Sequence, residues 1–310
     1  MPIAPLDDAT LLRELEPVAE SLYQRHDAAT KEWFPHEVVP WSRGRDFVAG
    51  EAWEVPADGP PAAVRSALFV NLLTEDNLPY YFRTIERMFG NDGVWGAWAR
   101  RWTAEEGRHS IVIRDYLTVT RAIDPVALER APMAQVSGGM TPEPTTAADG
   151  FAYVALQELA TRISHRNTGK LMDSAGHDVM ARVAKDENHH FLFYRDLMKA
   201  ALEVDPSGGV IAIERQVREF EMPGTGIPDF ADHARAIADA GIYDFTAHHD
   251  QILVPTVLRQ WGVEELTDLT PEAEEARRKV VKRIGQVGRA AARIASRRAE
   301  RDAKELVLSG

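Results

Sequence analysis

The sequence carries the pattern Glu-x-x-His twice, first at Glu106–His109 and again, 81 residues later, at Glu187–His190. Both copies lie in long stretches whose apolar residues recur at spacings of three and four, the period of one face of an α-helix. In each stretch the glutamate and the histidine fall on that apolar face, so their side chains point toward the core. Any fold of this chain must therefore place two carboxylates and two imidazoles between helices.

Each motif follows another predicted helix that has a glutamate on its apolar face. Glu75 precedes Glu106 by 31 residues, and Glu158 precedes Glu187 by 29 residues. The chain therefore contains two helical hairpins of one plan, with a single glutamate on the first helix and Glu-x-x-His on the second. Helical periodicity dominates the rest of the sequence as well. Long helices are expected over residues 62–90, 94–122, 150–168, 175–203, 208–220 and 229–260.

Unpaired, these four carboxylates and two imidazoles would each destabilise a core by an amount on the order of several kcal/mol. Two Fe2+ ions remove this cost, because carboxylates bind and bridge hard cations while imidazole supplies one nitrogen to each ion. A single Glu-x-x-His is common in helices that bind no metal, but this doubled set is that of di-iron carboxylate bundles. We therefore predict an all-α fold with a ferritin-like di-iron four-helix bundle core and additional helices. The predicted metal ligands are Glu75, Glu106, His109, Glu158, Glu187 and His190.

Two neighbours of these ligands lie off the inward face. Glu105 is about a quarter turn away from Glu106, and His189 is about 100° around the helix from His190. Each is expected either to be solvated or to support the ligands from outside the ligand set.

Composition limits the class of protein. Cysteine is absent, which excludes disulfides, thiolate metal sites and thiol catalysis and fits a reducing compartment. Apolar runs such as ALFV and VIAI are far shorter than the roughly 18 residues of a membrane span, and the N-terminus shows no signal peptide. The net charge of −12 argues against nucleic-acid binding. A soluble, cytoplasmic protein without a membrane span is expected.

The chain is expected to form a ferritin-like di-iron domain over residues 1–270 and a basic C-terminal helical extension over residues 271–310. Residues 277–304 hold eleven Lys and Arg against two acidic residues, a net charge of +9, so the rest of the chain carries −21. The extension also has an apolar stripe that must pack on the body or on a second subunit. This stripe consists of Val280, Ile284, Val287, Ala291 and Ile294. Residues 134–150 are expected to be a flexible loop.

Four segments resemble those of one known enzyme family. The segments LLTEDNLPYY, WTAEEGRHS, LQELATRISHRNTGK and KDENHHFLFYRDL are similar, in order and spacing, to the core segments of the soluble acyl-ACP desaturases, the stearoyl-ACP desaturase-like type 2 fatty acid desaturases. The resemblance covers roughly residues 10 to 275 and is closest to the actinobacterial branch. It implies an oxidoreductase of fatty acid biosynthesis, usually homodimeric. Its di-iron centre would activate O2, take electrons from ferredoxin and form a cis double bond in an acyl chain on acyl carrier protein.

The resemblance also assigns roles outside the ligand set. Thr161 matches a threonine that assists proton delivery beside the oxygen-binding face, and Asp186 matches the acid that supports His109. Trp33 matches a tryptophan that leads electrons through Asp186 and His109 to iron, although an aromatic plug under the connector at 32–61 is an open alternative. The positions that match the lining and the end of the acyl channel are Thr74, Trp102, Thr84 and Met88.

Some positions depart from the plant members of the family. Gly107 replaces an asparagine, His189 replaces an arginine, and Arg87 stands near the channel end where plant enzymes have a small polar residue. Arg87 therefore leaves the acyl chain length and the double-bond position open. Plain core packing is an open alternative role for Thr74 and Trp102.

The basic extension is a candidate surface for the acidic carrier protein, as are Arg162, Arg166 and Lys170 if they are exposed. The alternative for each is an ordinary solvated helix face. A di-iron hydroxylase or other oxygenase on a carrier-bound substrate stays open as a second function, and a ferritin-like iron-binding protein as a third. A ribonucleotide reductase radical subunit is disfavoured, because its first ligand is normally Asp and the first ligand here is Glu75. We expect an acyl-ACP desaturase.

Overall fold

The computed structural model describes residues 4–139, 143–224 and 226–309, with side chains described through residue 300. Every regular element within these ranges is helical, which confirms the predicted all-α fold. The α-helices are α1 (Asp8–Ala29), α2 (Pro35–Val38), α3 (Ala62–Glu75), α4 (Leu78–Phe89), α5 (Gly93–Thr120), α6 (Pro125–Gly138), α7 (Ala147–Lys170), α8 (Ser174–Val204), α9 (Pro206–Glu219), α10 (Phe230–Asp239), α11 (Phe245–Ala247) and α12 (Pro271–Ser309). Two 3-10 segments, η1 (Trp41–Arg43) and η3 (Val263–Glu265), and one π-helix, η2 (His248–Gln260), complete the described elements.

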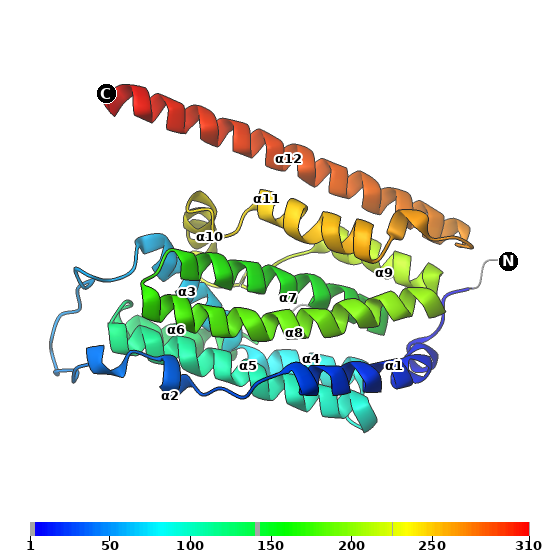
Figure 1. Cartoon of the computed structure of the whole chain (residues 1–310), viewed down its shortest axis with the longest axis horizontal. Coiled ribbons are helices and arrows are strands. Elements are labelled where there is room, and N and C mark those ends of the chain that lie inside the picture. Colours follow the sequence, from blue (N-terminus) through cyan, green and yellow to red (C-terminus); the bar gives the residue numbers. More distant parts are fainter. Residues whose placement is uncertain (1–3, 140–142, 225, 310) are drawn as a thin grey trace.

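The longest helices run side by side along the long axis of the molecule (Figure 1). α7 and α8 form a tightly packed antiparallel hairpin, α8 also packs on α1, and α5 packs on α3, α4 and α8. α7 is buried on most of its surface and presents small residues such as Ala152, Ala155 and Ala160, so its neighbours approach closely. Thr146 and Asp149 form a capping box that begins this helix. The two predicted hairpins thus meet in one ferritin-like bundle.

The doubled motif lies between the two larger apolar cores of the bundle. On α5, the buried residues 94–102 belong to the first core and residues 112–119 to the second. On α8 the order is reversed, with residues 179–183 in the second core and 191–202 in the first. The Glu-x-x-His residues occupy the interval on both helices, so the polar cluster sits halfway along the bundle.

The predicted single helix over residues 62–90 is wrong, because the chain breaks between α3 and α4. Pro79 has no backbone N–H to donate to the carbonyl of Glu75, and its ring would clash with that carbonyl in a continuous helix, so α3 cannot continue without interruption. α3 therefore ends at Glu75, and α4 begins at Leu78 after a two-residue turn. This break places Glu75 at the C-terminal end of α3, directly before α4, the second helix of this region that lines the site.

The predicted helix over residues 229–260 is also divided. α10 ends at Asp239, and Gly241 turns the chain with a φ of 71°, a conformation that glycine adopts without strain. Asp244 then accepts hydrogen bonds from the backbone N–H groups of Thr246 and Ala247 and begins the next helical segment. The predicted loop over 134–150 is partly helical, since α6 continues to Gly138, while residues 140–142 lie outside the described part of the chain.

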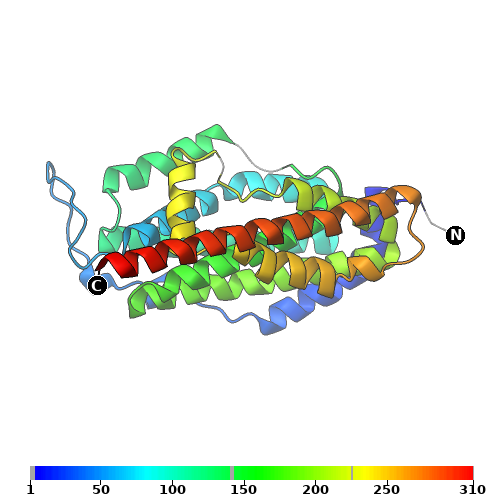
Figure 2. The ribbon, with the colours of Figure 1, turned by 90° about the horizontal axis from the view of Figure 1, so that it is seen from above.

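α12 lies along the outside of the bundle, lengthwise across the other helices (Figure 2). It packs on α9, α11 and η2 of the same chain. Ala273, Val280, Ile284 and Ala291 are buried there, whereas Ile294 is 37% exposed. The apolar stripe therefore packs on the body rather than requiring a second subunit, and the division of the chain at residue 270 stays a prediction. Among the described helices, none has the length and apolar composition needed to cross a membrane.

Candidate metal centre

Four helices bring the six predicted metal ligands into one cluster. Their donor atoms form two groups of four, and within each group all the atoms lie within 4.8 Å of one another. One group is Glu75, Glu106, His109 and Glu187, and the other is Glu106, Glu158, Glu187 and His190. Glu106 and Glu187 belong to both groups. Two ions held here would share these two carboxylates, and each ion would have one glutamate and one histidine of its own.

The two histidines present the same nitrogen to the cluster. His109 Nδ1 lies 3.0 Å from Glu106 Oε2 and 3.6 Å from Glu187 Oε1. His190 Nδ1 lies 2.8 Å from Glu106 Oε1 and 3.6 Å from Glu158 Oε2. Since the two ends of Glu-x-x-His are one helical turn apart, α5 and α8 each deliver a carboxylate and an imidazole to the same point.

The outer nitrogen of His109 faces an acid from the opposite hairpin. His109 Nε2 lies 3.5 Å from Asp186 Oδ2, and Trp33 Nε1 donates a 2.8 Å hydrogen bond to the same oxygen. Asp186 immediately precedes Glu187, so α8 supplies both a shared carboxylate and the support for a histidine of α5. Such an outer partner holds the ring orientation of a metal-binding histidine. The roles of Trp33 and Asp186 in electron transfer stay predictions.

His190 has a corresponding support that comes from α5. Its Nε2 lies 2.9 Å from Glu105 Oε2, which is also 2.9 Å from His26 Nε2 of α1. Arg101 donates a 2.7 Å hydrogen bond to the other oxygen of Glu105. Glu105 is only 2% exposed, so the solvated alternative is wrong and the supporting one describes its position. In each motif, the acid before the glutamate thus supports the histidine of the other motif.

Burial and the neighbouring charges shift the pKa values of the carboxylates in the cluster strongly. Burial and the neighbouring Glu187 and Glu106 charges raise the pKa of Glu158 well above its usual range. Burial likewise raises the pKa of Glu75 to about 8, against the opposing effect of the nearby His165. Buried donor atoms that face the cluster, such as Glu158 Oε2 and His190 Nδ1, have no hydrogen-bond partner among the described residues. A buried set of carboxylates and imidazoles with such unsatisfied atoms fits two divalent cations.

Metal affinity is expected to rise with pH from 4.5 to about 8, because Glu75 and Glu158 must lose protons before they bind a cation. The stability of the metal-free protein should instead decrease as the pH rises over this range. The folded-state pKa of Glu75 exceeds its unfolded value of 4.5, so its contribution is present below pH 4.5 and is lost as the pH rises through 8. Thermal unfolding across this range, with and without Co2+, measures both effects. A Co2+-induced gain in Tm that is independent of pH would contradict them.

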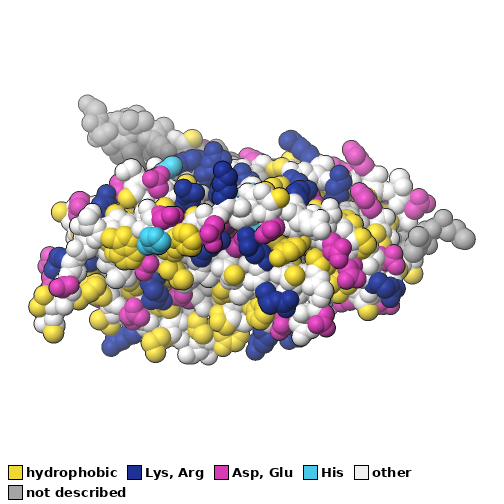
Figure 3. Space-filling model, turned by 60° about the horizontal axis from the view of Figure 1, so that its bottom comes forward, with side chains coloured by type: hydrophobic (Ala, Val, Ile, Leu, Met, Phe, Trp, Pro, Cys, Tyr) yellow, Lys and Arg dark blue, Asp and Glu magenta, His cyan; other side chains and the backbone are white. Residues whose placement is uncertain are grey.

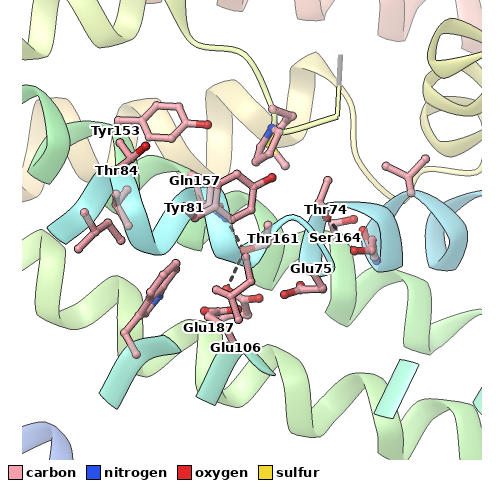
Figure 4. Close-up of a pocket in the computed structure, with 18 of the residues that line it drawn as sticks. Thr74, Glu75, Tyr81, Thr84, Glu106, Tyr153, Gln157, Thr161, Ser164 and Glu187 are labelled. Carbon is pink, nitrogen blue, oxygen red and sulfur yellow. Dashed lines mark hydrogen bonds between the residues drawn. The ribbon is translucent and has the colours of Figure 1, made fainter. Parts of the chain in front are cut away.

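An apolar cavity runs across the carboxylates of the cluster (Figure 4). Glu75, Glu106 and Glu187 reach its wall together with Thr161, whose hydroxyl donates a 2.8 Å hydrogen bond to Glu187 Oε2. All four predicted channel positions line this cavity: Thr74, Trp102, Thr84 and Met88. Trp102 also donates a 3.0 Å hydrogen bond to Glu158 Oε1, so it joins the cavity wall to the cluster. That the cavity holds an acyl chain stays a prediction at this point.

The two ends of the cavity differ. At one end Met88 meets α7 so closely that a Cβ added at Gly150 would lie 3.0 Å from Met88 Cε. The neighbouring Phe89 is 4% exposed and belongs to the apolar core. At the other end the cavity is lined by Tyr243 and by residues of α10, a helix without buried residues. The cavity therefore borders the apolar core beside Met88 and lies near the surface beneath α10.

Sequence reasoning missed one buried histidine of the cluster. His165 is 1% exposed, and its Nε2 lies 3.4 Å from Glu187 Oε1 and 3.7 Å from Glu75 Oε1. It follows Glu158 by seven residues, so extending the inward stripe of Glu158 and Thr161 by one turn would have found it. Other cavity residues to which the sequence analysis gave no role include Tyr81, Tyr153, Gln157 and Ser164.

Three residues depart from the plant pattern: Arg87, Gly107 and His189. Arg87 is exposed and pairs with Glu143 at 3.4 Å outside the cavity, so it does not shape the closed end directly. A Cβ added at Gly107 would meet no atom within 4 Å, which agrees with the expectation that this position leaves the ligands unaffected. His189 Nε2 has no hydrogen-bond partner among the described residues, and its ring lies 5.9 Å from that of His26.

The helical bundle and its paired carboxylate–histidine groups define a ferritin-like protein with a candidate site for two metal ions. The family model described as fatty acid desaturase matches residues 7–309. The chain belongs to the fatty acid desaturase family, which confirms the resemblance stated from its motifs.

Individual relatives agree with this assignment. The chain is 42% identical over 285 residues to DesA1 of Mycobacterium tuberculosis, named as an acyl-[acyl-carrier-protein] desaturase, covering 88% of this chain and 84% of that protein. It is 33% identical over 224 residues to stearoyl-[acyl-carrier-protein] 9-desaturase 6 of Arabidopsis thaliana, covering 66% of this chain and 57% of that protein. The X-ray structure of the M. tuberculosis H37Rv protein DesA2, named as an acyl-ACP desaturase, matches with a TM-score of 0.68 and 27% identity, covering 86% of this chain and 99% of that one. The mycobacterial similarities confirm the predicted actinobacterial branch.

Proposed function

We propose that this protein is an acyl-[acyl-carrier-protein] desaturase, which introduces a cis double bond into a fatty acyl chain held on acyl carrier protein. The observation that carries the proposal is the apolar cavity that borders the core beside Met88 and runs across the carboxylates of the cluster. A site that only stored iron would need no such cavity beside its ligands. The names of the relatives agree with this function.

The chemistry of the substrate determines which part of the reaction the metal ions must supply and which part the protein must supply. An alkyl chain offers no acid, charge or polarised bond, so acid–base groups cannot begin the reaction. Two iron ions, when bound, supply the oxidation of unactivated C–H bonds by O2. The acyl chain loses two hydrogen atoms, and these hydrogens, with two electrons from ferredoxin and two protons, convert O2 into two water molecules. The protein's task is to aim one pair of carbons at the cluster and to exclude water.

We assign the six ligands according to the two overlapping groups. Glu75 and His109 would hold one ion, Glu158 and His190 the other, and Glu106 and Glu187 would bridge both. The hydroxyl of Thr161 lies in the cavity wall and contacts Glu187, which suits the delivery of protons beside the substrate.

Trp33, Asp186 and His109 form a continuous contact path from the connector after α1 to a ligand. Trp33 is 3% exposed, so it also packs in the second core, and both open roles agree with its position. We assign the entry of electrons from ferredoxin to this path. The homodimer and the cytoplasmic location stay predictions from the sequence.

The exposed face of α12 is our candidate surface for the acidic carrier protein. Lys282, Arg289, Arg293 and Arg297 share one face of this helix, opposite its buried stripe. All four are exposed, and within the described part of the chain no acidic side chain pairs with any of them. The face of the molecule in Figure 3 intersperses acidic and basic side chains, so a stripe of one sign is a local feature.

α12 also reaches the open end of the cavity. Arg298 donates a 2.7 Å hydrogen bond to the carbonyl of Ala238 and pairs with Asp244 at 3.3 Å. These two residues adjoin Ile237 and Tyr243, which line the cavity. A carrier on the basic stripe would therefore sit beside the mouth. On α7, Arg166 and Lys170 are exposed as well, whereas Arg162 is half-buried.

Neutralising the α12 stripe should weaken substrate binding without changing the chemistry. Replacing Lys282, Arg289, Arg293 and Arg297 together by glutamine is expected to raise KM for acyl carrier protein substrates on the order of tenfold at low salt, with kcat nearly unchanged. The matched control is the replacement by glutamine of four exposed cations on α1, α6 and α8: Arg13, Arg130, Arg182 and Lys199. Steady-state kinetics at two salt concentrations measure the difference. Equal KM changes in the two variants would show that α12 is an ordinary solvated face.

The proposed reaction is tested by its product. Iron-loaded protein is supplied with ferredoxin, its reductase, NADPH, O2 and a panel of acyl carriers of different chain length, and the acyl products are analysed by mass spectrometry. Loss of one H2, absent in Glu106→Ala and His190→Ala, is the expected result. Gain of one oxygen atom would instead identify the hydroxylase alternative. O2 consumption with every acyl chain unchanged would favour the iron-binding alternative and overturn the proposal.

A further inference from the structure

The buried His165 lies against the cluster without belonging to its doubled ligand plan. It follows Thr161 by one turn of α7, so both side chains face Glu187. His165 Nε2 lies 3.4 Å from Glu187 Oε1 and 3.7 Å from Glu75 Oε1, and it has no hydrogen-bond partner in the described structure. A polar atom this deeply buried requires a partner, and the two carboxylates are its neighbours.

The position of the proton on His165 follows from its other nitrogen. Nδ1 lies 3.1 Å from the side-chain nitrogen of Asn71, which comes from α3 one turn before Glu75. With this orientation of the Asn71 amide, its nitrogen donates to Nδ1 of His165, and a ring proton resides on Nε2. His165 therefore directs an N–H group at the oxygens of Glu75 and Glu187.

This contact makes the two shared carboxylates unequal. Thr161 donates to Glu187 Oε2, and His165 faces Glu187 Oε1, so α7 holds both oxygens of Glu187. The oxygens of Glu106 instead lie 3.0 Å and 2.8 Å from the inner nitrogens of His109 and His190, which are themselves predicted ligands. Glu106 is thus held by two predicted ligands, whereas Glu187 is held by Thr161 and His165, which are outside the predicted ligand set.

We propose that His165 is a positioning residue that donates a hydrogen bond from its Nε2–H to the carboxylates of Glu75 and Glu187 and so organises the metal subsite of Glu75 and His109. This inference rests on the proposed metal centre. Supports of this kind are worth about 10–100-fold in metal affinity. Because His165 contacts Glu75, which belongs to one subsite only, as well as the shared Glu187, its loss should weaken the subsite of Glu75 and His109 more than that of Glu158 and His190. Two ions that bind together in the natural protein should then bind in two separate steps.

The test is a Co2+ titration of the full-length metal-free protein, followed by calorimetry and by visible absorption, in the absence of any acyl substrate. In His165→Ala the first ion should bind nearly as before and the second about 10–100-fold more weakly. His165→Gln places an amide N–H close to the position of Nε2, so it should restore binding to within about threefold of the natural protein. His189→Ala, a neighbouring histidine that does not face the cluster, is the matched control and should bind as the natural protein does.

The outcomes separate three roles. Unchanged binding by both ions in His165→Ala would overturn the proposal. Weak binding in both His165→Ala and His165→Gln, with altered Co2+ absorption, would show that His165 is itself a ligand, which also overturns it. If His165→Ala fails to fold, His165→Gln still decides between a hydrogen-bond donor and a ligand. Absence of two-ion binding in the natural protein would refute the proposed metal centre instead, so the two failures are distinguishable.

Discussion

Replacing Glu158 by glutamine is expected to abolish activity while leaving the stability of the metal-free protein nearly unchanged. Burial and the charges of Glu187 and Glu106 raise the pKa of Glu158 well above its usual range, which favours the neutral form of this carboxyl in the metal-free protein. Glutamine is neutral, has the same shape and can still accept the hydrogen bond from Trp102. The free energy of unfolding should therefore change by less than about 1 kcal/mol.

With metal present the same substitution should be severe. An amide carries no negative charge, so the subsite of Glu158 and His190 loses its own anionic ligand. Activity should fall more than about a hundredfold, since even partners outside a ligand set cost 10–100-fold when they are lost. Calorimetric unfolding with and without Co2+, together with turnover, measures both effects. Glu129→Gln on α6, which removes an exposed glutamate, is the control. A Glu158→Gln protein that binds two ions with natural affinity would show that Glu158 is not a ligand.

Changing the closed end of the cavity should change the preferred acyl chain length. Thr84 and Met88 line this end, and the hydroxyl of Thr84 has no hydrogen-bond partner among the described residues. Thr84→Leu fills space without breaking a hydrogen bond and should favour shorter chains, whereas Met88→Ala opens space and should favour longer ones. A single methylene group in such a pocket is worth about 10–200-fold in kcat/KM. The ratio of kcat/KM between acyl carriers that differ by two carbons should therefore shift by at least about tenfold in opposite directions.

The mouth of the cavity provides the control for this experiment. Thr74 lines the opposite end, so Thr74→Leu should alter KM for every chain length alike and leave the ratio unchanged. Competition between two acyl carriers in one reaction, with mass spectrometric analysis, measures the ratios directly. A shift of the same size in Thr74→Leu and Thr84→Leu would mean that Met88 does not mark the end of the acyl chain.

The sequence predicted the six candidate ligands, which the structure brings into one cluster, because their spacing repeats a local rule. Glu-x-x-His spans one turn of helix, and an apolar stripe shows which face of that helix is buried. The same rule failed for His165, although it continues the stripe of Glu158, because a lone histidine on an apolar face carries no second copy to support it. Pro79 indicated a break between α3 and α4, but the continuous apolar pattern on either side of it indicated a single helix.

Contacts between distant parts of the chain were beyond the reach of periodicity. Asp186 lies 153 residues from Trp33, and Glu105 lies 79 residues from His26, so no local pattern relates either pair. The resemblance to known desaturases supplied the first pair, and the structure supplied the second. The outward position of Arg87, paired with Glu143, likewise depends on how the chain after α6 returns to α7. Periodicity thus predicts which side chains of one helix face the core, whereas tertiary packing determines which residues they contact.

The most direct test of the paired-metal account is anomalous diffraction at the iron edge from crystals of the iron-loaded protein. The account predicts two iron peaks. One should lie among Glu75, Glu106, His109 and Glu187, and the other among Glu106, Glu158, Glu187 and His190. A single peak, or a peak among His26, Glu105 and His190, the third group of donor atoms that lie within 4.8 Å of one another, would contradict it.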